Sequence, residues 1–461
     1  MGSRWDGSHG QECPCYSPMK LVCTFLETTP LTISEPAMTY SPACGSAAHL
    51  SRRSFLQGVT TGALGAIGFA GLTHARAAEQ LTRAQKQVVV FWLSGGVSQL
   101  ETWDPKPGTD NGGPFQTIET SVPGTHICEL LPYTAKQMHH LALVRGINTK
   151  EGDHGKGAYI MQHGYKKTPG FEYPHLGSAF SSLLTPAGSP LPGYIHVAGG
   201  ANAKDASFLG PRHAPVALAN GKAPDHLDRA AGMTAEADAK RRAMRAKVSQ
   251  QFSTGRKATE TEAYSASYDQ AASLMARKDI FDFSTISEAD FARYGKHDFA
   301  RHCLMARKLV ENGVTFTKVN HREYDTHSEN FNFHIEQLGE FDQPFAAFVE
   351  DLADRGLLAN TLVIVMCEFG RTPRINQRVG RDHWGTAWSI AVGGAGIKGG
   401  AVVGKTNENG TKVIDREVDG GHLFHTYYKA VGIDSTQPFW DNDRPYHKAD
   451  PQASAIDEIL A

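Results

Sequence analysis

The chain alternates short apolar runs with longer stretches in which apolar residues recur at helical spacing. The apolar runs, each bounded by turn residues, predict buried strands at 88–93, 141–145, 194–197, 314–319, 361–367 and 388–392. Helical spacing predicts a long amphipathic helix over 334–355 ended by Gly356, a helix beginning at Ala158 and a closing helix over 423–431. Strands that alternate with helices predict an α/β fold with a mostly parallel sheet covered on both faces.

A segment from 225 to 312 departs from this alternation. It is rich in Ala, Arg, Lys and Glu and follows a helical pattern with breaks near Gly255 and Phe283. We expect a helical insertion that covers the sheet, rather than a separate domain.

The N-terminal region has the pattern of an export signal. Arg52 and Arg53 precede a Gly/Ala-rich apolar stretch over 58–72, and Ala75-Arg76-Ala77 is typical of a cleavage site. This predicts a twin-arginine signal peptide over 38–77 and a mature domain over 78–461, with 1–37 as an upstream extension and translation starting at Met38. The alternative is a buried helix or a membrane anchor, but the stretch is short and Gly-rich for a bilayer span. We therefore expect a periplasmic or secreted protein, exported in folded form by the twin-arginine machinery and without a stable membrane anchor.

Composition excludes several classes of protein. The 461 residues carry a formal net charge of −2, and no basic stretch is concentrated enough to indicate nucleic-acid binding. Of seven cysteines, only Cys128, Cys303 and Cys367 follow the predicted cleavage site, and such a widely spaced, odd number is no disulfide framework.

Side chains suited to metal binding follow the predicted strands of the last third. They are Asp325 and His327, Glu368 with Arg371, and Asp382 with His383. Carboxylates and imidazoles are ligands of divalent cations, and strand ends on one sheet edge bring such groups together. Singly, each aspartate also suits a helix cap or a turn, and each histidine a structural hydrogen bond. Asp382 also suits a partner that orients a metal-bound histidine.

The chain resembles the uncharacterised family called DUF1501 from Ser51 to the C-terminus. The motifs that carry the resemblance are the twin-arginine start, Ser94-Gly95-Gly96-Val97-Ser98-Gln99, Thr102-Trp103-Asp104-Pro105-Lys106-Pro107, Asp153-His154, Asp325-Thr326-His327, Glu368-Phe369-Gly370-Arg371-Thr372-Pro373 and Gly380-Arg381-Asp382-His383-Trp384. That family resembles a divergent branch of the alkaline phosphatase and sulfatase superfamily. The resemblance implies a three-layer α/β/α sandwich and metal-dependent hydrolysis of phosphate or sulfate esters.

The superfamily pattern implies a set of metal ligands. Asp325, His327 and His383 fit one metal site, with Zn, Mn or Ca as the divalent ion. Glu368 fits the carboxylate of a second site, although Phe369 stands where that site's histidine is expected. The acidic group after the first strand is Glu101 or Asp104, and we favour Asp104. Arg371 either steadies an anionic oxygen of the substrate or forms a salt bridge within the fold.

The nucleophile departs from the superfamily pattern. Residues 153–157 offer no hydroxyl or thiol, so His154 is a nucleophile, a general base or a metal ligand, or else a metal-bound water attacks directly. We expect a metal-dependent hydrolase-like protein with His154 and Arg371 facing an anionic ester such as a sulfated or phosphorylated glycan. The alternative is a non-catalytic periplasmic binding or assembly protein that keeps the fold.

Overall fold

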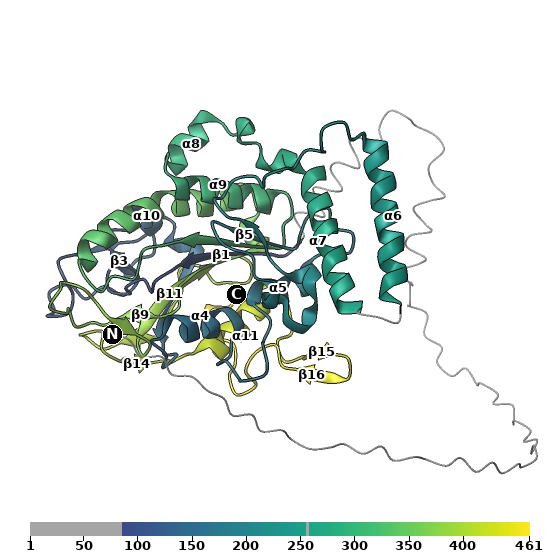
Figure 1. Cartoon of the computed structure of the whole chain (residues 1–461). Coiled ribbons are helices and arrows are strands. Elements are labelled where there is room, and N and C mark those ends of the chain that lie inside the picture. The colour runs from purple at the N-terminus through teal and green to yellow at the C-terminus, as the bar shows by residue number, and fades with distance from the viewer. Residues whose placement is uncertain (1–84, 255–257) are drawn as a thin grey trace, which may run out of the picture. The chain divides into compact units, whose positions relative to one another are not determined.

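The computed structural model describes residues 85–254 and 258–461, and the segments expected to be an upstream extension and a signal peptide lie outside these residues. An eight-stranded sheet forms the centre (Figure 1). The strand order across it is β12 (Val402–Val403), β4 (Leu141–Ile147), β11 (Trp388–Gly393), β8 (Thr361–Met366), β1 (Gln87–Leu93), β7 (Phe316–His321), β5 (Tyr194–Val197) and β6 (Val216–Leu218).

The sheet is parallel except at one strand. Neighbouring strands pair in parallel from β8 through β1, β7 and β5 to β6, and so do β4 and β12. Only β11 runs in the opposite direction, antiparallel to both β4 and β8. The carboxyl ends of the other strands therefore meet at one edge, together with the start of β11.

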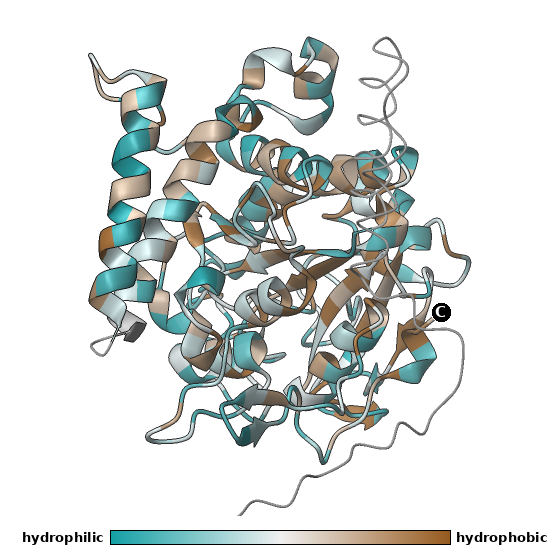
Figure 2. Cartoon of the chain, turned by 90° about the vertical axis from the view of Figure 1, so that its right-hand side faces the viewer, coloured by the Kyte–Doolittle hydropathy of each residue, from teal (hydrophilic) through white to brown (hydrophobic). Residues whose placement is uncertain are grey.

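Helices cover both faces of the sheet (Figure 1). The helices on one face are α8 (Glu288–Tyr294), α9 (Asp298–Glu311) and α10 (Asn330–Asp354), and those on the other are α4 (His154–His163), α5 (Leu176–Leu184) and α11 (Gly420–Ala430). Phe91 of β1 packs edge-on against Phe345 and Phe348 of α10, with ring centroids 5.1 and 5.2 Å apart. Phe180 of α5 stacks on Phe316 of β7 across the opposite face. Figure 2 shows the apolar residues gathered in the central strands.

The predicted α/β class, with its mostly parallel sheet between two helical layers, is confirmed. Several element boundaries differ from the prediction, such as the starts of α10 at Asn330 rather than 334 and of α11 at Gly420 rather than 423. The helix α4 begins at His154 rather than Ala158, because the Asp153 carboxylate accepts a hydrogen bond from the backbone of Lys156 and caps the helix there. The strand β7 continues to His321, since its polar last residues still pair in register with β1.

The segment 225–312 contains two different kinds of helix. The helices α6 (Ala235–Ser253) and α7 (Ala258–Ala276) pack against each other, and Asp238 is the only buried residue described in α6. In contrast, α9 buries ten residues and contacts β7, β5 and α10. It is thus an integral part of one helical layer of the sandwich.

Small elements complete the fold. A short helix, α3 (Pro132–Lys136), contacts α10. The two-stranded pairs are β2 (Thr117–Glu119) with β3 (His126–Cys128), β9 (Gly370–Arg371) with β10 (His383–Trp384), β13 (Lys405–Thr406) with β14 (Val413–Asp415), and β15 (Phe439–Asp441) with β16 (Arg444–Tyr446). Among the described residues, no helix has both the length and the apolar character needed to cross a membrane.

Candidate metal centre

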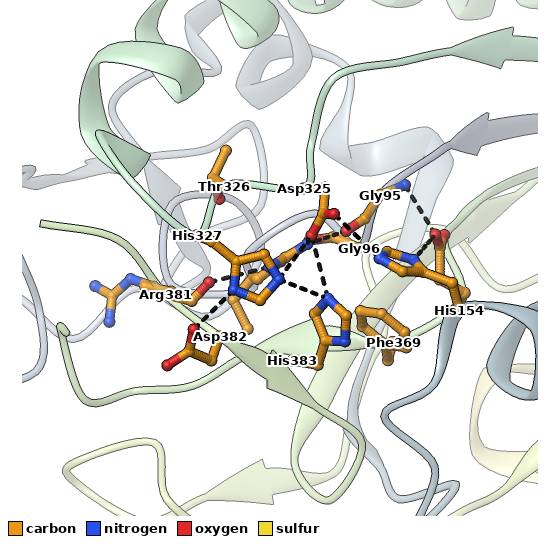
Figure 3. A network of polar contacts seen from close by, with 12 residues as sticks. Gly95, Gly96, His154, Asp325, Thr326, His327, Phe369, Arg381, Asp382 and His383 are labelled. Atoms are coloured by element: carbon orange, nitrogen blue, oxygen red, sulfur yellow. Dashed lines mark hydrogen bonds and ion pairs between the residues drawn. The ribbon is translucent and has the colours of Figure 1, made fainter. Parts of the chain in front are cut away.

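The candidate residues meet at the carboxyl edge of the sheet. Asp325 and His327 follow β7, Glu368 follows β8, and His154 opens the helix that follows β4. His383 arrives by a different route, because it precedes the antiparallel β11, which starts opposite the end of β4. Segments far apart in the sequence are thus brought together around one point (Figure 3).

Three ligand atoms converge at this point. Oδ1 of Asp325 lies 3.2 Å from Nε2 of His327 and 3.1 Å from Nε2 of His383. The two Nε2 atoms lie 2.9 Å from each other. Figure 3 shows both rings directed at the Asp325 carboxylate.

The other nitrogen of each ring fixes its protonation. Nδ1 of His327 lies 2.7 Å from Oδ1 of Asp382, and Nδ1 of His383 lies 2.7 Å from the carbonyl oxygen of Gly152. Both partners are acceptors, so each Nδ1 carries a proton and donates it. In the neutral ring, Nε2 then carries a lone pair and no proton, which is the state that a metal requires of its ligand.

The charges at this point favour a cation. Burial lowers the pKa of His383, despite its bond to Asp325, and so keeps that ring neutral. Burial would raise the pKa of Asp325, but the hydrogen bond and the charge of Arg371 outweigh it and lower that pKa to about 2. When both rings are neutral, two imidazole lone pairs and an ionised carboxylate face and repel one another. A cation at their centre removes this repulsion.

His154 lies on the other side of Asp325. Its Nδ1 is 2.9 Å from Oε1 of Glu368 and its Nε2 is 3.2 Å from Oδ2 of Asp325. The hydrogen bond to Glu368, more than the charge of Asp325, raises the pKa of His154 against the effect of burial. One ligand atom each from His154, Asp325 and His383 also lies within 4.8 Å of the others. Both ring nitrogens of His154 nevertheless lie against carboxylates, which favours the protonated form of the ring.

Glu368 is buried and fixed in place. Its Oε1 accepts hydrogen bonds from the backbone N–H of Gly95, at 2.9 Å, and from His154. Its Oε2 is also buried but has no hydrogen-bond partner. Glu368 thus touches the centre through His154 and keeps one free acceptor.

Arg371 is wholly buried and all of its nitrogens are engaged. Nε donates to the carbonyl oxygen of Gly96 at 2.8 Å, and Nη1 to that of Arg381 at 3.0 Å. Nη2 donates to the carbonyl oxygen of Gly95 and to Oδ1 of Asp325. Of the two roles left open by the sequence, this geometry favours the salt bridge within the fold. Arg371 orients Asp325 and, because it is wholly buried, does not reach a substrate in the open.

Neither acidic residue after β1 joins the centre. Oδ1 of Asp104, the favoured candidate, lies 2.8 Å from Nζ of Lys106, and its Oδ2 accepts the hydroxyl of Thr406. Glu101 forms a fully buried pair with Arg381, with Oε1 2.8 Å from Nη2. Their partners hold both carboxylates away from Asp325, so Asp104 drops out of the ligand set.

The comparisons with known proteins place the chain in a family. A family model described as "Protein of unknown function (DUF1501)" matches residues 85–460. The chain belongs to the DUF1501 family. The family resemblance predicted from the motifs is thereby confirmed. None of the curated proteins matches this DUF1501 chain.

Solved structures with similar topology include three kinds of protein. The lipoteichoic acid synthase LtaP from Listeria monocytogenes is 8% identical over 82% of this chain and 80% of its own, with a TM-score of 0.36. An alkaline phosphatase from the Antarctic bacterium TAB5 is 14% identical over 76% and 98%, with a TM-score of 0.34. The PsFucS1 sulfatase from Pseudoalteromonas sp. is 11% identical over 85% and 75%, with a TM-score of 0.36. At these values the similarities carry no argument about the activity of this DUF1501 protein.

Two features of the DUF1501 centre went unnoticed in the sequence. The carbonyl oxygen of Gly152 orients His383, and a backbone acceptor leaves no trace in residue type. The ring of Phe369 lies 4.4 Å from that of His383 and 4.9 Å from that of His154, and forms an apolar wall. Gly96 passes directly behind this wall, at φ +83°, and a Cβ there would lie 2.6 Å from the Phe369 ring. In the sequence, the glycine pair after β1 was the feature that could have indicated how closely the backbone approaches the Phe369 ring.

Proposed function

We propose that this DUF1501 protein binds one divalent metal ion through Asp325, His327 and His383 and hydrolyses phosphate or sulfate esters. The observation that carries the proposal is the meeting of three ligand atoms within 2.9–3.2 Å, with the second nitrogen of each ring placed against an acceptor. A structural pair of histidines would share a proton along such a short contact. Here the acceptors Asp382 and Gly152 hold those protons elsewhere.

The donor set fits a small ion. In a tetrahedral zinc site with bonds of about 2.0–2.1 Å, neighbouring ligand atoms lie about 3.3 Å apart, close to the separations found here. Calcium prefers six to eight oxygen ligands at about 2.3–2.6 Å, which two imidazoles and one carboxylate oxygen do not supply. Of the three ions expected from the sequence, zinc and manganese therefore fit the residues better than calcium. When bound, the ion supplies Lewis-acid stabilisation and an acidified water.

The residues around the centre have separate tasks. His154 stands at the first turn of α4, with 41% of its side chain exposed, and holds a proton that it can donate to an anionic oxygen. Glu368 fixes the orientation of that ring, and Arg371 fixes Asp325. The positive end of α4 adds to the attraction for an anion. Together these groups favour an anionic ester, such as a sulfated or phosphorylated glycan, as the substrate.

One observation favours a second candidate function, a metal-containing binding protein without turnover. Within residues 85–254 and 258–461, no Ser, Thr or Cys side chain is hydrogen bonded to the side chains of Asp325, His327, His383 or His154. A protein nucleophile of the usual kind is thus missing from this part of the centre. Hydrolysis then depends on His154 or on an activated water.

The export route is part of the same proposal. We propose that the twin-arginine signal over 38–77 directs the folded protein to the periplasm or the medium. Mass spectrometry of the exported form tests this, with Ala78 as the expected first residue. An unprocessed N-terminus on the exported protein would contradict it.

Metal analysis is the first experiment. The purified protein is expected to contain about one equivalent of Zn or Mn, which His327→Ala loses while His126→Ala, an exposed histidine on β3, retains it. Turnover of aryl phosphate and aryl sulfate esters is then measured for the wild type and His154→Ala. Turnover abolished by His154→Ala supports the hydrolase, and metal without turnover supports the binding protein. Metal retained in His327→Ala would contradict the ligand set itself.

A further inference from the structure

A basic loop connects β9 to β10 beside the metal centre. It runs from Arg371 to Asp382 and contains four arginines and one acidic residue. Two of the arginines, Arg371 and Arg381, are fully buried and paired with Asp325 and Glu101, respectively. These two side chains fix both ends of the loop to the body of the protein.

The middle of the loop is equally well fixed. Asn376 donates to the carbonyl oxygen of His327 at 3.0 Å and to Oδ1 of Asp382 at 3.2 Å. Its own side-chain oxygen accepts the backbone N–H groups of Arg378 and Gly380. A loop held in this way presents its outer side chains with little further ordering.

The other two arginines, Arg374 and Arg378, are exposed and have no carboxylate partner. Within the described parts of the chain, neither forms an ion pair, in contrast to Arg371 and Arg381. They line a shallow groove of about 460 Å³, whose lining residues are Thr372, Arg374, Asn376, Gln377, Arg378 and Asp382. In the described parts of the chain, the side-chain donors of Thr372 and Asn376 are already bonded, whereas those of Arg374, Gln377 and Arg378 have no partner.

The groove opens next to the metal centre. Asp382 is the only acidic residue in its lining, and its Oδ1 is 2.7 Å from Nδ1 of His327. One imidazole ring therefore separates the groove from the three converging ligand atoms (Figure 3).

We propose that Arg374 and Arg378 bind a second ester anion, sulfate or phosphate, of a substrate whose first ester anion lies at the metal centre. Planar guanidinium groups match the oxygens of tetrahedral anions, and two unpaired ones on a fixed loop are suited to such a group. The substrate is then a polyanion with anions on neighbouring units. This inference rests on the proposed function for the class of ester, but the groove binds its anion whether or not turnover follows.

The test compares ligands that differ by one anion. Dissociation constants are measured by surface plasmon resonance for a monosulfated and a disulfated form of one disaccharide, and for the corresponding phosphorylated pair. The disulfated or the diphosphorylated form is expected to bind about tenfold more tightly than its partner, since two charge-assisted contacts are added. The pair with the larger difference in affinity identifies the ester as sulfate or phosphate.

Substitutions in the groove test whether the preference for the doubly charged ligand arises there. Arg374→Ala/Arg378→Ala should abolish the preference and leave binding of the single anion unchanged. The matched control is Arg241→Ala/Arg301→Ala, which removes the same charge from exposed positions on α6 and α9 and should keep the preference. Equal binding of both forms by the wild type, or a preference that survives in the groove variant, would overturn the inference. Loss of metal and turnover with the preference intact would refute the proposed function alone.

Discussion

At the scale of single residues, the metal centre depends on the partners of its histidines. Asp382 holds a proton on Nδ1 of His327, and its pKa is lowered mainly by that hydrogen bond. The carbonyl oxygen of Gly152 does the same for His383. Both imidazoles are therefore already oriented in the way that the proposed metal site requires.

Asp382→Asn tests this orientation. An asparagine amide keeps the size of the side chain but replaces the charged acceptor of Nδ1 by a neutral, weaker one, so we expect metal affinity to fall by about 10–100-fold. Competition with a chromophoric chelator measures this change. Asp441→Asn, on the β15–β16 pair, serves as a control that leaves the affinity unchanged. An affinity unchanged in Asp382→Asn would show that His327 needs no partner or is no ligand.

Gly96 gives a second prediction at this scale. Its φ of +83° disfavours any side chain, and a Cβ would also lie 2.6 Å from the ring of Phe369. Gly108, at φ +74°, has nothing within 4 Å of its Cβ position and isolates the backbone effect. We expect Gly108→Ala to cost about 1 kcal/mol of unfolding free energy and Gly96→Ala about 3 kcal/mol or more. Chemical denaturation measures both, and equal losses would contradict the packing account.

Residue types and the family resemblance together selected most of the residues that meet at the candidate metal centre. Asp325, His327, His383, Glu368 and His154 were all chosen from motifs, and the structure brings them together. Asp104 was chosen because it follows the first strand, but Lys106 and Thr406 bind its oxygens. Long-range partners of this kind decide which of two nearby carboxylates turns toward a site. The pattern of residues along the chain does not reveal these partners.

At the scale of elements, an ionic cluster joins the three helices of one layer. Asp351 of α10 accepts hydrogen bonds from Arg293 at 2.8 Å and Tyr294 at 2.8 Å, both in α8, and pairs with Arg307 of α9 at 2.5 Å. Burial would raise the pKa of Asp351, but the bonds from Arg307 and Arg293 outweigh it and lower that pKa. The carboxylate is thus ionised and shared by α8 and α9.

The stabilisation by Asp351 should depend on pH. Because its folded pKa lies below the unfolded value of about 3.9, the contribution is complete above that pH and is lost as the pH falls through the folded pKa. We expect Asp351→Asn to cost about 3 kcal/mol at pH 7, since it removes the buried ion-pair partner of the buried Arg307. The difference from wild type should shrink below about pH 4.

Thermal unfolding from pH 3 to pH 8 follows this change. Glu350→Gln is the matched control, because Glu350 also pairs with Arg293 but is 46% exposed. Its effect should stay below about 1 kcal/mol at every pH. An Asp351→Asn deficit that is constant or grows toward low pH would contradict the account.

Element boundaries were predictable where the apolar pattern was strong. The strands β1, β4, β5, β8 and β11 and the helix α10 all lie close to their predicted positions, and Gly356 adopts the expected left-handed conformation after α10. The antiparallel direction of β11 was not predicted, because an apolar run has no direction. That reversal is what carries His383 to the carboxyl edge.

At the scale of the whole molecule, the layers around the sheet differ from the α6–α7 pair in how much they bury. The core includes β1, β8 and β11 in full, with α9 and α10 packed on them. In α6, the apolar side chains of Met244, Val248 and Phe252 are half or more exposed. The composition suggested a single helical insertion over 225–312. In the structure, this segment contains both helices of a core layer and a pair of helices outside the core.

Substitution of two methionines tests this difference in burial through the free energy of unfolding. Met305 of α9 is completely buried, whereas Met244 of α6 is 71% exposed. Met305→Ala removes buried side-chain atoms and leaves a cavity, so we expect it to cost about 2–5 kcal/mol. Met244→Ala changes a surface side chain and should alter stability by less than about 0.5 kcal/mol. Denaturant titrations of the two variants give both values, together with the slope that reports the surface exposed on unfolding. If Met244→Ala proved as costly as Met305→Ala, α6 would bury this side chain in solution, and the division between core layers and outer helices would be wrong.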